Sequence, residues 1–270
     1  MSEFVDTLKM GDFAVLLKGV VIVIGKPGFI SEILINIEGK NVNQHPYNLD
    51  VVKNLNKLVL DDKVTFIVGE NGTGKSTLIE AIAIAYGFNS EGGSINFNFS
   101  TRFSSSDLYK NMQLKKTLNR PKDGYFLRAE SFYNVATNIE EMDALPAAAK
   151  KIIESYGGKS LHEQSHGESF LSLFLNRFGG NGFYILDEPE AALSVQRQLT
   201  FVSHLHGLVK RNSQFVIATH SPIILSYPNA IIYEIREDGL SIVKYEDTEQ
   251  YKSMKLFINN YPSILKKIMQ

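Results

Sequence analysis

The sequence predicts an α/β fold built on a mixed, mostly parallel β-sheet with helices on both faces. Short apolar runs at 63–68, 183–186 and 215–218 have the length and composition of buried parallel strands. Segments with helical spacing of apolar residues lie between them, and this alternation is typical of a parallel sheet covered on both sides. A glycine-rich turn joins the first of these strands to a helix.

The composition is that of an ordinary globular protein. The chain has 270 residues, 44% of them hydrophobic and 21% charged, which excludes a disordered or collagen-like chain. It contains no cysteine, so disulfides, thiolate nucleophiles and cysteine-ligated metals are excluded. With 28 Lys+Arg and 29 Asp+Glu the net charge is -1, which predicts no global attraction to nucleic acid or membrane. A local basic patch stays open.

The most apolar stretch, residues 13–24, is interrupted by Lys18 and Gly19. It is shorter than the roughly 20 apolar residues that cross a bilayer, so we expect two short strands there. The N-terminus carries Glu3 and Asp6 where a signal peptide would be basic. We therefore expect a cytoplasmic protein without direct membrane insertion, for which another chain would supply any anchor.

The N-terminal part predicts two strands and a helix. In 30–38 isoleucines alternate, which is typical of a strand, and 51–58 is a short amphipathic stretch. The compact apolar run 63–68 ends at Gly69 and predicts a buried strand. Residues 76–86 place Leu78, Ile82 and Ala85 at helical spacing.

The middle part has weaker signals. Residues 87–124 are rich in Asn, Ser and Gly, with one predicted strand at 95–99, and a second strand is expected at 125–128. A helix is expected at 147–156, where Gly157 and Gly158 would stop it. Another is expected at 168–178.

The C-terminal part alternates again. Strands at 183–186 and 215–218 flank a long helix at 193–211. A hairpin is predicted through Asp238-Gly239, between 230–235 and 240–244. The tail from 247 onward is expected to be helical.

The glycine-rich turn fits the phosphate-loop pattern G-x-x-x-x-G-K-[ST], and it lies between a strand and a helix as that motif requires. Its backbone N–H groups and the helix N-terminus are expected to bind phosphate. Lys75 is expected to reach the β- and γ-phosphates, and Ser76 to hold Mg²⁺. The predicted nucleotide-binding residues of the loop are Gly69, Glu70, Asn71, Gly72, Thr73, Gly74, Lys75, Ser76 and Thr77.

Two carboxylates follow the strand at 183–186. Open α/β sheets bind ligands at the carboxyl ends of their strands. Asp187 is suited to Mg²⁺ binding, and Glu188 is placed to polarise an attacking water. Glu190 is better explained as an acid at a helix start.

Two further turns are candidate ligand sites. Residues 165–169 begin a helix with Ser and Gly, which together can bind an anion or simply cap the helix. His220 ends the strand at 215–218, where it can hydrogen-bond a γ-phosphate, orient water or serve a structural purpose.

In order along the chain stand GENGTGKST, SHGES, YILDEPE and ATHS. Together they resemble the Walker A, signature, Walker B and switch-histidine motifs of the ATP-binding-cassette (ABC) ATPase superfamily, over about residues 30–235. The stretches DEPEAALS and ATHSPIIL are most similar to soluble bacterial ATPases of the AAA family, the AAA-21-like group.

The resemblance implies a P-loop NTPase fold of ABC-ATPase type over residues 1–270. Its parts would be an N-terminal antiparallel β part, a core of about 30–235, a helical signature insert of about 101–180, and a C-terminal hairpin and helical tail of about 230–270. ATP and Mg²⁺ would be the cofactors.

The resemblance also implies the roles of the site residues. Glu188 would be the general base, His220 the γ-phosphate switch, and Ser76 with Asp187 the metal ligands. Ser165, Gly167 and Glu168 would contact ATP held by a second subunit, in an ATP-dependent homodimer with twofold symmetry. Tyr47 is the candidate for stacking on adenine. Glu130, with Gln113 as the alternative, takes the place of the family's Q-loop glutamine near the metal.

The expected function is a soluble, Mg²⁺-dependent ATPase that acts as a switch or motor for an unidentified partner. The nucleotide-binding subunit of a membrane transporter is one alternative, because the stretch between Lys75 and Ser165 is similar in length to the insert of such subunits. A DNA-maintenance or phage-defence ATPase is the other. It would need a separate effector, since no coiled coil or nuclease segment is expected in this chain.

Overall fold

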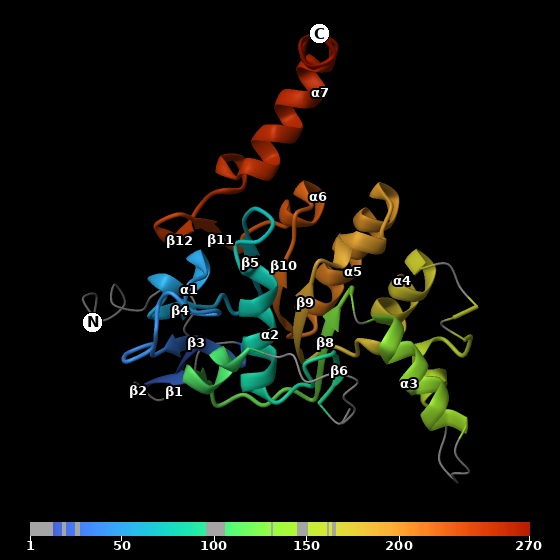
Figure 1. Cartoon of the computed structure of the whole chain (residues 1–270). Helices are drawn as coiled ribbons and strands as arrows, with labels where there is room; N and C mark the ends of the chain where they lie inside the picture. The colour runs from blue at the N-terminus through green and yellow to red at the C-terminus, as the bar shows by residue number, and fades with distance from the viewer. Residues whose placement is uncertain are drawn as a thin grey trace.

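The computed structural model describes residues 28–95, 106–130, 132–144, 151–160, 162–163 and 166–270, together with the backbone of 13–17 and 20–24. Two β-sheets and a hairpin make up its strand content (Figure 1).

The central sheet holds the predicted parallel strands. Its order is β12 (Gly239–Ile242), β11 (Ile231–Arg236), β5 (Val64–Val68), β10 (Gln214–Ala218), β9 (Gly182–Asp187), β8 (Asp123–Arg128) and β6 (Gly93–Ser94). The five inner strands are parallel, and the two edge strands run antiparallel to their neighbours. Every residue of β5, β9 and β10 is buried, because helices cover both faces. The mixed, mostly parallel sheet is confirmed.

The smaller sheet is the predicted N-terminal antiparallel part. Strand β3 (Ile30–Ile35) pairs with β4 (Lys57–Val59) on one side and β7 (Met112–Lys116) on the other. The two strands expected in the apolar stretch are present as β1 (Phe13–Leu17) and β2 (Val20–Ile24), and their backbones pair as a hairpin. Strand β7 was not predicted, because its five residues are mostly polar and are held by pairing with β3.

One buried amide joins the two sheets. Gln214, at the start of β10, accepts hydrogen bonds from the backbone N–H groups of Phe29 and Ile30 at 2.8 and 2.9 Å. Its amide nitrogen donates to the carbonyls of Ile30 and Asp61 at 2.7 and 2.8 Å. This side chain therefore satisfies four backbone groups and fixes β3 against the central sheet.

Helices divide between the two faces of the central sheet. Helix α2 (Lys75–Tyr86) and the short α1 (Asp50–Lys53) share a core cluster with β3. The other face is covered by α3 (Phe132–Ala144), α4 (His166–Arg177) and α5 (Val195–Lys210). At the carboxyl side of β10 lies α6 (Pro222–Leu225), and α7 (Glu249–Ile268) extends beyond the body beside it (Figure 1).

Two sequence predictions in the middle of the chain need correction. Helix α3 was missed. The helix expected at 147–156 is, over its described part, the 3₁₀ helix η2 (Ile152–Tyr156), whose first N–H groups donate to Asp143. The strand expected at 95–99 lies almost entirely outside the described residues. Among the described helices, none combines the length and apolar composition of a bilayer-spanning segment.

Asp123 ties the start of β8 to the end of α4. Its carboxylate accepts hydrogen bonds from Arg177 at 2.8 Å, Tyr184 at 2.8 Å and the Gly179 N–H at 3.0 Å. Burial alone would raise the pKa of Asp123. The Gly179 N–H and the Arg177 guanidinium outweigh burial, so this pKa lies below its ordinary value.

We therefore predict that Asp123→Asn lowers the free energy of unfolding by about 2–4 kcal/mol at pH 7, because the largely buried guanidinium of Arg177 loses its carboxylate partner. The depressed pKa means that the stabilisation is present above about pH 4 and is lost as the pH falls further. Urea unfolding at pH 7 and at pH 3 measures both effects. Asp50→Asn, which breaks the exposed pair with Lys53, is the control and should cost under about 0.5 kcal/mol. Equal losses in the two variants would contradict the prediction.

Candidate active site

The phosphate loop connects β5 to α2, as the sequence predicted. Gly74 has φ 97°, and a Cβ there would lie 2.8 Å from Val51 Cγ1, so only glycine fits this left-handed position. Lys75 Nζ donates to the carbonyls of Gly69 at 3.0 Å and Glu70 at 2.7 Å. Burial lowers the pKa of Lys75 from its ordinary value, while nearby carboxylates, Glu188 first among them, act against that shift.

A cavity of about 300 Å³ opens over this loop. It is lined by His45, Leu49, Asn71, Gly72, Gly74, Lys75, Ser76, Thr77 and Glu188. The loop and the carboxylate that follows β9 thus share one cavity, although they are more than a hundred residues apart in sequence.

Asp187 ends β9 beside the first turn of α2. Ser76 Oγ donates to Asp187 Oδ1 over 3.2 Å. The carboxyl group is almost completely buried, and burial raises its pKa to about 7, with Arg128 acting in the opposite direction. A hydroxyl and a carboxylate side by side are hard oxygen ligands, so this pair fits Mg²⁺.

Arg128 is a site residue that sequence reasoning missed. It ends β8 directly opposite Asp187 in the parallel register, with its Nε 3.7 Å from Asp187 Oδ2. Its two terminal nitrogens pair with Glu80 of α2 at 2.6 Å and with Glu130 at 3.3 Å. A charged residue at the end of a predicted parallel strand was the available signal.

Glu130, the residue predicted near the metal, lies at the surface beside Arg128. Its side chain is 83% exposed and contacts Arg128, so the structure brings Arg128 and not Glu130 to Asp187. The alternative, Gln113, pairs opposite Leu34 in the smaller sheet.

Glu188 and His220 face each other across neighbouring strands. Glu188 has φ 51°, a left-handed conformation that is strained for a non-glycine residue, and its N–H donates to the Ala218 carbonyl over 3.0 Å. Its Oε1 lies 3.5 Å from His220 Nε2. Glu188 lines the cavity, and His220 lies behind it with its Nε2 atom buried and without a hydrogen-bond partner among the described residues.

Glu190 does more than begin a helical turn. It lies in the first turn of the 3₁₀ helix η3 (Pro189–Ala192), and its carboxylate accepts hydrogen bonds from the His220 N–H and, at 2.8 Å, from Thr219 Oγ1. Ser221 Oγ in turn donates to Gln198 Oε1 over 2.6 Å. The side chains of Glu190 and Gln198 therefore attach residues 219–221, the histidine loop, to the segment after β9.

The predicted signature turn lies at the start of α4. Ser165 lies outside the described residues. Gly167 is buried, and a Cβ there would contact the Ala192 carbonyl and lie 2.6 Å from Arg197 Nη1. Glu168 pairs with Arg197 over 3.1 Å. Helix α4 packs on the face of the sheet opposite α2, and the two helices belong to different core clusters.

Tyr47 is not available for stacking, which corrects that prediction. It is buried, its hydroxyl donates to Asp107 Oδ1 at 3.0 Å and accepts from Asn111 Nδ2 at 2.9 Å, and it belongs to the core below β3. The exposed His45, two residues earlier, lines the cavity in its place. The sequence did not show that Tyr47 is buried, because burial depends on the packing of distant segments.

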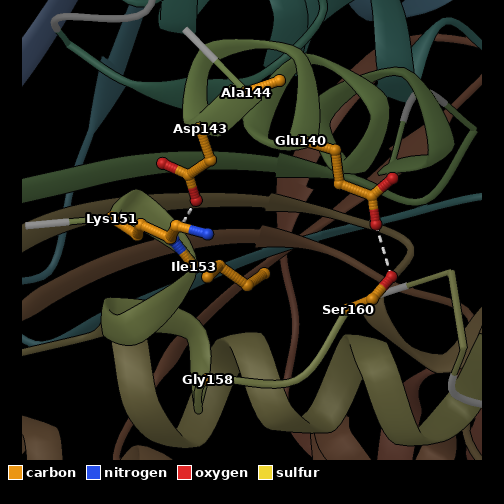
Figure 2. Close-up of a pocket in the computed structure, with 7 residues that line it drawn as sticks. All are labelled: Glu140, Asp143, Ala144, Lys151, Ile153, Gly158 and Ser160. Atoms are coloured by element: carbon orange, nitrogen blue, oxygen red, sulfur yellow. Dashed lines mark hydrogen bonds between the residues drawn. The ribbon is translucent and has the colours of Figure 1, made fainter. Parts of the chain in front are cut away.

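A second cavity of about 300 Å³ lies between α3 and η2 (Figure 2). Its two carboxylates are engaged: Asp143 caps η2, and Glu140 accepts a hydrogen bond from Ser160 Oγ. These contacts make the cavity part of the packing between α3 and η2.

The parallel sheet, the phosphate loop and the acidic end of β9 define a P-loop ATPase of ABC type, an enzyme that hydrolyses ATP. The chain belongs to the AAA domain family, which it matches over residues 36–173. The resemblance drawn from the four motifs is confirmed at this level.

The chain is also similar to individual proteins of known name. The tungstate uptake system ATP-binding protein TupC of Campylobacter jejuni is 26% identical over 82% of this chain and 72% of its own length. The chromosome partition protein Smc of Methanocaldococcus jannaschii is 26% identical over 51% of this chain and 13% of its own length. Among solved structures, an inward-facing metal-chelate type ABC transporter aligns over 84% of this chain and 88% of its own, with 15% identity and a TM-score of 0.48.

Proposed function

We propose that this protein is a cytoplasmic, Mg²⁺-dependent ATPase that forms a homodimer around ATP and acts as a switch for a partner. The observation that carries the proposal is the cavity in which Lys75 and Ser76 of the phosphate loop meet Glu188. We take residues 1–270 as one ATPase domain, with a core of about 30–235, a signature insert of about 101–180 and a C-terminal part of about 230–270.

The triphosphate would bind at the start of α2. The N–H groups of residues 69–77 and the helix N-terminus attract phosphate oxygens, and Lys75 would exchange its two carbonyl contacts for the β- and γ-phosphates. Ser76 and Asp187 would hold Mg²⁺, which when bound neutralises charge on the phosphate oxygens.

Hydrolysis would depend on Glu188 and His220. Glu188 would accept a proton from the attacking water and orient it toward the γ-phosphate. His220, 3.5 Å from that carboxylate, would donate a hydrogen bond to a γ-phosphate oxygen. Glu190 would fix the backbone of the histidine loop so that both groups meet one phosphate.

The dimer part of the proposal rests on the position of α4. This helix packs on the opposite face of the sheet from α2, the helix that follows the phosphate loop. Ser165, Gly167 and Glu168 would therefore serve the ATP bound by a second copy, in an isologous arrangement with two equivalent sites.

His45 would contact the base. We predict that His45→Ala raises the Kd for ATP by about tenfold, because a base–aromatic stack contributes about 1–3 kcal/mol, and that it changes kcat little. Calorimetry with ATP and Mg²⁺ measures the first quantity, and steady-state kinetics the second. His45→Tyr should restore binding. An unchanged Kd in His45→Ala would remove His45 from the nucleotide site.

Tyr47→Phe is the matched comparison. It removes the hydroxyl that Asp107 and Asn111 bind, so it should lower stability by about 1 kcal/mol without changing the Kd for ATP. A rise in Kd in Tyr47→Phe would show that the hydroxyl, through Asp107 and Asn111, is needed to shape the nucleotide site.

The direct test of the proposed function measures ATP hydrolysis and oligomeric state on the same protein. Wild-type protein should hydrolyse ATP with Mg²⁺ and not with EDTA, and sedimentation velocity should show a monomer without nucleotide and a dimer with a non-hydrolysable ATP analogue. No affinity for ATP in calorimetry would overturn the proposal.

The ATP-binding subunit of a membrane uptake system is a second candidate. The similarity to TupC over most of this chain favours it. Copurification of a membrane protein with the tagged chain would support it. DNA-stimulated turnover would instead favour a role on DNA.

A further inference from the structure

Helix α7 has one apolar face that its own chain leaves uncovered. Tyr251, Met254, Ile258, Tyr261, Leu265 and Ile268 recur at spacings of three and four, which places them on one side of the helix. No residue of α7 is buried, and all twenty are described. Ile258 is 62% exposed and Ile268 72%. A face of this length is rarely left exposed to water.

The base of α7 is fixed close to the switch histidine. Tyr245, just before the helix, donates its hydroxyl hydrogen bond to the Pro222 carbonyl over 2.9 Å. Pro222 begins α6 and lies two residues after His220. The Glu249 N–H donates to Glu234 at 3.1 Å, and Thr248 caps the helix. The first turn of α7 is therefore held at the edge of the sheet where its parallel strands end.

From that edge the helix extends outward. Figure 1 shows α7 leaving the body beside α6 and continuing well beyond it. The phosphate loop, Glu188 and His220 follow the carboxyl ends of β5, β9 and β10, on this same edge. A second copy that supplies its signature turn to the nucleotide approaches this edge. It then lies within reach of α7, which is about 30 Å long at 1.5 Å per residue.

We propose that α7 is an arm whose apolar face packs against the second copy of this chain in the ATP-bound dimer. The inference rests on the proposed function, because it needs a dimer that closes around ATP at the edge of the sheet where β5, β9 and β10 end. The opposite side of the helix carries Lys252, Lys255, Lys266 and Lys267 and stays in water. The arm starts beside the segment His220–Pro222. Nucleotide binding at His220 and docking of α7 would therefore both act on this segment.

The first test measures dimer strength. In the Glu188→Gln background with ATP and Mg²⁺, sedimentation velocity should show that M254E/I258E weakens the dimer by about tenfold or more. The matched control, L256E/N260E, adds the same two charges at the same spacing on the other side of α7 and should leave the dimer unchanged. Circular dichroism checks that both variants keep their helix.

The second test locates the contact. The chain has no cysteine, so Ile258→Cys supplies a single thiol for a benzophenone photocrosslinker. With ATP it should give a crosslinked dimer, and Leu256→Cys should give far less. Crosslinking that does not depend on nucleotide would overturn the proposal.

The outcomes separate the two proposals. A Glu188→Gln dimer that is unaffected by M254E/I258E and gives no Ile258 crosslink would overturn the arm and leave the ATP dimer standing. A chain that stays monomeric with ATP would overturn both. Flotation with phosphatidylserine vesicles, lost in M254E/I258E and unaccompanied by a crosslink, would overturn the arm and identify a lipid surface as its occupant.

Discussion

In Glu188→Gln, ATP turnover is expected to fall by about 10²–10⁴-fold, which is the usual contribution of a positioned general base. ATP binding should survive, because Lys75, Ser76 and the loop backbone are unchanged. The amide keeps the shape of the side chain but cannot take a proton from water. Since hydrolysis is what would release the dimer, this variant should accumulate as an ATP-loaded dimer.

Single-turnover kinetics, calorimetry and sedimentation velocity measure these three consequences on one sample. Glu130→Gln is the matched control: it makes the same chemical change at a carboxylate that contacts Arg128 and solvent. Its turnover should stay within about threefold of wild type, because an exposed ion pair contributes little. If Glu130→Gln instead lost turnover as severely as Glu188→Gln, Glu130 would belong to the metal site after all.

A variant of Glu188 that turned over at the wild-type rate would remove it as the base. His220, which faces it at 3.5 Å, would then be the next group to test. A variant that lost both turnover and ATP binding would show that the carboxylate is needed to shape the cavity.

The sheet could be predicted from the sequence because its strands are buried on both faces. Strands β5, β9 and β10 each have a continuous apolar run, which has few alternative explanations when glycine or a carboxylate follows it. The phosphate loop could also be predicted. Its backbone is left-handed at residue 74, which requires glycine, and this requirement is visible in the sequence motif. In contrast, β7 is held by its neighbour β3 and leaves no such pattern.

The candidate site was only half predictable, for a related reason. Residues defined by a motif, such as Ser76 and Asp187, lie together as expected. Residues that reach the site because their strands are neighbours in the sheet cannot be recognised from the order of residues along the chain. Arg128 reaches Asp187 because β8 pairs with β9, and His45 rather than Tyr47 lines the cavity because β3 packs as it does. Pairing and packing of distant segments decide these positions.

Glu190 is the most informative of the residues to which no motif assigned a role in the site. We predict that Glu190→Ala lowers kcat by about 10²-fold, because it frees the His220 N–H and Thr219 Oγ1 and lets the histidine move relative to Glu188. A displacement of about 1 Å at a reacting centre can cost this much. The Kd for ATP should stay within about twofold, since Glu190 does not line the cavity.

Glu190→Gln separates positioning from fold. Its amide oxygen can still accept from the His220 N–H, so kcat should recover to within about tenfold of wild type. Glu190→Ala should also keep its unfolding midpoint to within a few degrees if the effect is local. Equal losses of kcat in the two variants would mean that the charge of Glu190, and not its grip on the histidine loop, is what hydrolysis requires. A collapse of the unfolding midpoint in Glu190→Ala would instead make it a structural residue of the β9–β10 edge.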